Sequence, residues 1–99
     1  GGIGISSLAG ATYLQVLSLK ACTLIRSEAI ANCHSIETIY VPNITELGNT
    51  VLGDSVFASI TGQTITLTVP SALMTCNGGN PDGDIQTLQA ANTVTIVTV

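Results

Sequence analysis

Charged and aromatic residues are scarce in this sequence of 99 residues. Only Lys20 and Arg26 are basic, against six acidic side chains, and the formal net charge is −4. Two bases form no patch that neutralises phosphates, so neither nucleic acid nor an anionic membrane surface is an expected partner. Disorder is excluded too, because 45% hydrophobic against 8% charged residues is the opposite of a disordered composition.

Long apolar runs and paired cysteines are also missing. No stretch of about 18 apolar residues is present, so the sequence predicts no insertion into a membrane. Cys22, Cys33 and Cys76 are an odd number and form no C-x-x-C pair, which argues against a disulfide framework. Free cysteine behaves as a small hydrophobe, and Cys33 is predicted to be a buried thiol.

Few residues suggest chemistry. Cys33 and the single histidine, His34, are adjacent, and adjacent side chains usually point apart, which favours a packing or surface role over catalysis. Asn80, Asp82 and Asp84 resemble a calcium loop, but counting from Gly78 places Gln89 where a bidentate glutamate is required. We therefore expect no catalytic residue, metal site or cofactor.

The positive signal is a repeat. A fixed offset of this size is produced by stacked structural repeats. The apolar residues Leu14, Leu17, Leu19, Ile25, Ala29, Ile30 and Cys33 are followed, each 22 positions later, by Ile36, Ile39, Val41, Leu47, Val51, Leu52 and Ser55. We expect one domain over residues 1–99, with a partial repeat at 1–13, repeats at about 14–35, 36–63 and 64–92, and a terminal strand at 93–99.

Each repeat is expected to supply one strand and one short helix. Alternating or β-branched residues predict strands at 14–19, 36–41, 64–69 and 93–99, the last lying parallel to the third. Apolar residues at helical spacing predict helices at 25–33 and 50–57. A helical turn is expected at 71–75, and Asp84 is expected to cap a helix that buries Ile85, Leu88 and Ala91 and ends at Asn92.

A shorter motif inside the repeat carries a family resemblance over about residues 3–70. It runs Ile3-Gly4, Ser7-Leu8, Ala11, then Ile25-Arg26, Ala29-Ile30, Cys33, then Leu47-Gly48, Val51-Leu52, Ser55. The series resembles the I-G-x-x-A-F-x-x-C-x-x-L signature of BspA-like bacterial leucine-rich repeats, and Ile36, Ile39, Val41 and Pro42 match its I-x-(I/V)-P continuation. Arg26 departs from the glycine, Ile30 and Leu52 from the aromatic residue, and only Cys33 keeps the cysteine.

The resemblance implies an α/β fold: a short leucine-rich-repeat solenoid with a parallel sheet on its concave face and short helices or turns opposite. It also implies a non-enzymatic binding or adhesion module of a bacterial surface or secreted protein, with a protein or glycan partner. The alternative is a structural spacer or C-terminal cap of a longer solenoid. An open N-terminal repeat would also permit self-association.

Stacked strands would align their outward residues in rows, and repeat proteins generally bind through such a face. Val16, Thr38, Thr66 and Thr95 would form one row, and Ser18, Tyr40, Thr68 and Val97 another. Tyr40 is the expected anchor, because its ring offers contact area with a polar tip. The predicted partner-binding residues are Val16, Ser18, Thr38, Tyr40, Thr66 and Thr68; the alternative is a solvated sheet whose residues only favour β-structure.

Overall fold

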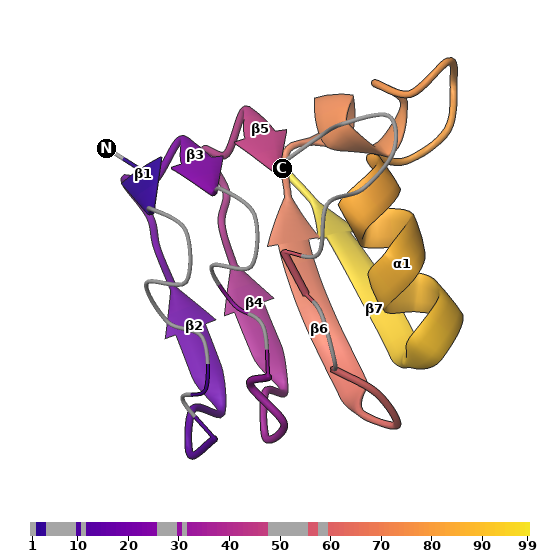
Figure 1. The fold of residues 1–99 in the computed structure, drawn as a ribbon. Coiled ribbons are helices and arrows are strands. Elements are labelled where there is room, and N and C mark those ends of the chain that lie inside the picture. The colour runs from indigo at the N-terminus through magenta and orange to yellow at the C-terminus, as the bar shows by residue number, and fades with distance from the viewer. Residues whose placement is uncertain are drawn as a thin grey trace.

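A computed structural model of the chain describes residues 2–3, 10, 12–25, 30, 32–47, 56–57 and 60–99. The fold is mixed α/β, and its largest element is a parallel sheet in the order β2-β4-β6-β7 (Figure 1). These strands span Val16–Ser18, Thr38–Tyr40, Thr64–Val69 and Thr93–Thr98. All four strands predicted from the alternating pattern are therefore confirmed, including the parallel pairing of the last two.

A second parallel sheet follows at one end of the first. It has three strands in the order β1-β3-β5, at Gly2–Ile3, Leu24–Ile25 and Glu46–Leu47. The predicted helix at 25–33 is thus wrong where it begins, because Ile25 pairs in register with Ile3 and Leu47. Residues 26–29 and 31 of this predicted helix lie outside the described residues. So do residues 50–55 of the second helix, predicted at 50–57.

The 22-residue offset of the sequence is the register of the three-stranded sheet and of the β2–β4 pair in the four-stranded sheet. Leu17 pairs with Ile39, and Ile25 pairs with Leu47. A side-chain bond repeats this step, since the Thr45 hydroxyl donates to the carbonyl of Thr23 at 2.9 Å. Between β4 and β6 the step becomes 28 residues, as the recurring Val-Pro pair predicts.

Buried aliphatic side chains fill the space behind the four-stranded sheet. Leu17, Ile39 and Leu67 are neighbours in one row of the register, and all three are buried. Ile30 and Cys33 come from the segment between β3 and β4 and are fully buried as well. The spaced apolar residues Ile25, Ile30 and Cys33 are therefore core residues, although those that the structure describes are not in a helix.

A left-handed backbone conformation recurs between β1 and β2 and between β3 and β4. Gly10 and Asn32, 22 positions apart, have φ angles of 79° and 63°. In each case the residue two positions later donates a backbone hydrogen bond to the carbonyl of the left-handed residue. Thr12 N donates to Gly10 O at 2.8 Å, and His34 N donates to Asn32 O at 3.0 Å. Glycine and asparagine are the residues that adopt this conformation most readily, so the repeat extends to the backbone.

The connection from β6 to β7 contains a 3₁₀ helix, η1 (Ser71–Met74), and the helix α1 (Gly83–Ala91), which lies beside β7 (Figure 1). The 3₁₀ helix confirms the predicted turn. Ile85 and Leu88 are buried as expected, but Ala91 is exposed. No helix in the described ranges is long and apolar enough to cross a membrane.

The cap of α1 differs from the prediction. Asp82, and not Asp84, is the N-cap: its Oδ1 accepts the Asp84 backbone N–H at 2.8 Å. Asp84 lies in the first turn, and its own Oδ1 accepts the Val56 N–H at 3.2 Å. Both aspartates suit a helix start, but the first position of the helix falls on Gly83, so the cap falls one residue before it.

We expect Asp82→Ala to lower the free energy of unfolding by about 0.5–2 kcal/mol, the range measured for lost N-caps. Asp82→Asn keeps a side-chain oxygen for the Asp84 N–H, so it should cost less than the alanine variant. Urea denaturation followed by far-UV circular dichroism measures both values. Equal losses in the two variants would contradict a role for Asp82 as the cap.

Candidate binding surface

The outward positions of the four-stranded sheet form two rows, which we call the threonine row and the tyrosine row. Neighbouring members are paired in the strand register, so each row crosses all four strands. The threonine row is Val16, Thr38, Thr66 and Thr95; the tyrosine row is Ser18, Tyr40, Thr68 and Val97. Together they make up the outer sheet face, and the alignment predicted for both rows is the one observed.

Exposure varies along these rows. Val16 at one edge is 59% exposed and Val97 at the other is 42% exposed, and Thr66 is exposed between them. Thr68 keeps only 8% of its surface, because it lies between Tyr40 and Val97 in the register. Of the predicted contact residues, Thr68 therefore offers a partner the least surface.

Tyr40 holds a central position. It lies in β4, an inner strand, with Ser18 on one side and Thr68 on the other. Its side chain is half-buried, so part of the ring is fixed by the sheet and part is open to a partner. A rigid aromatic side chain with a polar tip provides contact area at a low cost in conformational entropy.

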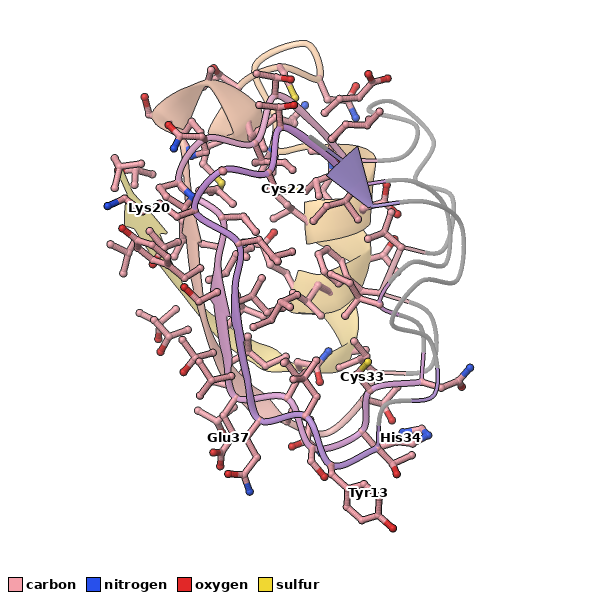
Figure 2. All side chains as sticks on the ribbon, turned by 90° about the vertical axis from the view of Figure 1, so that its left-hand side faces the viewer. Tyr13, Lys20, Cys22, Cys33, His34 and Glu37 are labelled. Carbon is pink, nitrogen blue, oxygen red and sulfur yellow. The ribbon has the colours of Figure 1, made fainter. Side chains whose placement is uncertain are left out.

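The outer sheet face carries no charge on its described strands. Every outward residue of β2, β4, β6 and β7 is threonine, serine, valine or tyrosine. Lys20 and Glu37 are exposed on the same side of the molecule, at opposite ends of the strands (Figure 2). A charged ligand would lose hydration on this face without gaining an ionic partner, so the face is better suited to an uncharged ligand.

Additional outward residues extend the face where β6 and β7 run together. Thr64 pairs with Thr93, and Thr66 with Thr95, so two T-x-T segments lie in register. Neighbouring strands are about 4.8 Å apart and alternate residues of a strand about 6.6 Å apart, which sets the spacing of these hydroxyl groups. In the sequence, the repeated T-x-T spacing indicates that these two segments are similar. It does not by itself give the 29-residue step that pairs Thr64 with Thr93.

The residues that suggested chemistry are not brought together. Cys33 is buried inside the fold, whereas His34 is exposed and points outward (Figure 2). All three cysteines are free thiols. Partial burial, together with the negative charge of Asp82, raises the pKa of the Cys76 thiol, which keeps this exposed cysteine in its weakly nucleophilic protonated form.

The asparagine and aspartate segment at 77–84 is a turn leading into a helix cap. Asn77 and Asn80 exchange backbone bonds at 3.0 Å in each direction around Gly78 and Gly79. Asp82 and Asp84 are buried at the start of α1. The described residues contain no group of three or more His, Cys, Asp or Glu side chains placed to hold a metal ion.

Comparisons of this chain with protein-family models, with curated proteins and with solved structures find no match. The distinguishing features of the outer sheet face are two rows in register, an uncharged surface and one central tyrosine.

Proposed function

We propose that this chain is a non-enzymatic binding module that recognises a protein or glycan partner through the outer sheet face. The fold we propose is a short leucine-rich-repeat solenoid of the BspA-like kind, from a bacterial cell-surface or secreted protein. The observation that carries the proposal is the alignment of the threonine and tyrosine rows across four parallel strands. An aligned, solvent-facing surface of this kind is the usual binding surface of repeat proteins.

The chemistry of the face supports a neutral partner. Hydroxyl groups of Ser18, Thr38 and Thr66 can each donate one hydrogen bond and accept others. Tyr40 adds an aromatic surface among them, and Val16 an exposed aliphatic one. Neutral glycans and uncharged polar patches of proteins present complementary groups, whereas nucleic acid would require a basic patch, and the chain has only two basic residues, Lys20 and Arg26.

Replacing Tyr40 and Thr66 together with glutamate should abolish partner capture while the protein stays folded. Both side chains face outward from the sheet. The change therefore introduces two charges on the proposed contact surface and leaves the buried residues Leu17, Ile39 and Leu67 unchanged. The wild-type protein is used to probe a glycan microarray and to select from a displayed random-peptide library. The ligands found in this way are the probes for the variants. We expect at least a tenfold loss of binding for selected ligands, or about 1.4 kcal/mol or more.

A double variant of α1, Gln89→Glu with Ala90→Glu, is the matched control. It adds the same charge at exposed positions of the helix, away from the outer sheet face. Circular dichroism checks that both double variants are folded. Equal loss of binding in the helix variant, or unchanged binding in the sheet variant, would remove the outer sheet face from consideration.

A terminal cap of a longer solenoid is the second candidate, favoured by the unequal ends of the core. At the β7 end, Leu73, Ile85 and Leu88 from η1 and α1 cover the core and are buried. At the β2 end, Leu14 and Leu19 are only partly buried, whereas Ile36 and Val41, their counterparts 22 residues later, are buried. A folded wild-type chain that selects no ligand from either library would favour this candidate.

A further inference from the structure

The edge strand β7 directs a set of backbone groups away from the molecule. Its odd-numbered residues bond towards β6: Thr93 N donates to Gln63 O at 2.9 Å, and Val99 N to Val69 O at 3.1 Å. Successive residues of a strand alternate in direction, so the N–H and C=O groups of Val94, Ile96 and Thr98 point to the other side. No hydrogen bond among the described residues reaches those groups.

Features that usually protect an edge strand are missing from β7. Natural edges are kept short or carry lysine, proline or a bulge. β7 has six residues, TVTIVT, with neither a charge nor a proline, and all six are paired without interruption to β6. The opposite edge, β2, has three residues and is followed by Lys20 after one intervening residue. β7 is therefore the edge better suited to accept another strand.

Charge does not oppose the meeting of two copies at this edge, although the chain carries a net charge of −4. The outward residues of β7 are uncharged, and so are the exposed residues of α1 beside it. Those helix residues are Gln86, Thr87, Gln89, Ala90 and Ala91. Among the described residues, the exposed charged side chains are Lys20 after β2, Glu37 before β4 and Glu46 in β5, so none lies on β7 or α1.

We propose that β7 pairs antiparallel with β7 of a second copy of this chain, about a two-fold axis at Ile96. The even-numbered residues then form the hydrogen-bonded pairs: Ile96 lies opposite its own copy, and Val94 opposite Thr98. Each pair exchanges two N–H···O bonds, which satisfies all the outward groups of Val94, Ile96 and Thr98. Such a contact is isologous and closes at the dimer.

This pairing makes one continuous eight-stranded sheet from the two four-stranded sheets. On its outer surface Thr95 of one copy lies beside Val97 of the other, so the outer sheet faces join across the axis. On the inner surface Ile96 meets Ile96, an aliphatic pair on the same side as Val94. The inference does not depend on the proposed ligand, but it doubles the surface available to one.

Sedimentation equilibrium of the 99-residue chain across a dilution series tests the proposal. The wild-type protein should fit a monomer–dimer equilibrium with no larger species. Val97→Lys places two lysines close to the axis and should raise the dissociation constant at least about tenfold. Thr98→Pro removes an edge donor that β6 does not use, and it should have the same effect.

Val16→Lys is the matched control, because it places the same charge on an exposed valine of the opposite edge strand. The dimer should be unchanged in this variant. A monomeric wild-type protein, species growing beyond the dimer, or dissociation caused by Val16→Lys would overturn the proposal. The last two results would instead indicate pairing through β2.

Amide hydrogen exchange provides a second readout that folding alone does not explain. In the wild-type dimer, the amides of Val94, Ile96 and Thr98 should be as slow as those of Thr95 and Val97. In Val97→Lys, the even-numbered amides should become fast while Thr95, bonded to β6, stays protected. Fast even-numbered amides in the wild-type protein at the highest concentration would also overturn the proposal.

Discussion

Ile39→Ala should lower the free energy of unfolding by about 2–5 kcal/mol, the cost of truncating a fully buried aliphatic side chain. Ile39 has 0% exposure and lies in the inner strand β4. Its register neighbours, Leu17 and Leu67, are buried on either side, so the cavity cannot be filled from the solvent. Chemical denaturation followed by circular dichroism measures the loss.

The matched substitution is Val16→Ala on the same sheet. Val16 is 59% exposed, and truncating it should change the free energy of unfolding by less than about 0.5 kcal/mol. Ile39→Val should fall between the two, at about 0.5–1.5 kcal/mol. If Ile39→Ala cost no more than Val16→Ala, the residues spaced 22 apart would not form the core.

Asn92→Ala should lower the free energy of unfolding by about 2–4 kcal/mol, because one side chain makes three hydrogen bonds, two with the segment before β6 and one with the last turn of α1. Its Nδ2 donates to the carbonyls of Ile60 at 2.8 Å and Leu88 at 2.9 Å. Its Oδ1 accepts the backbone N–H of Gln63 at 2.9 Å. Alanine leaves all three backbone groups without this partner just where the chain turns into β7.

Two further substitutions separate hydrogen bonding from packing at this position. Asn92→Asp keeps the size and the Oδ1 acceptor but places a second oxygen against the carbonyls of Ile60 and Leu88, so at pH 7 it should cost at least as much as alanine. Gln89→Ala, at an exposed position of the same helix, should cost under about 0.5 kcal/mol. If Asn92→Ala lowered the free energy of unfolding as little as Gln89→Ala, the hydrogen bonds of Asn92 would not stabilise the fold.

Strands with a long alternating pattern were accessible to sequence reasoning. Thr64–Val69 alternates threonine with aliphatic residues, and the strand has those bounds. The two-residue strands β3 and β5 are too short for any period to show, and the helical spacing of the apolar residues from Ile25 to Cys33 favours a helix instead. Their identity depends on pairing with residues 22 positions away, which is a property of the stack and not of the segment.

The two outward rows of the sheet were predictable in part. A 22-residue step between Leu17 and Ile39 also fixes Val16 opposite Thr38 and Ser18 opposite Tyr40. The row order predicts that Val97 lies next to Thr68, as observed, but it does not predict how much of the Thr68 side chain its two neighbours cover. The exposed fraction depends on how closely the side chains of Tyr40 and Val97 approach Thr68, which is a property of the folded sheet.

NMR titration of the isotope-labelled chain tests whether the outer sheet face binds a partner. A ligand found with the glycan array or the peptide library is added while the backbone amide shifts are followed. We expect the largest shift changes in β2, β4 and β6, around Tyr40 and Thr66, and we expect them to disappear in the double glutamate variant. Changes confined to α1 or to the turn at 77–80 would contradict binding through the outer sheet face.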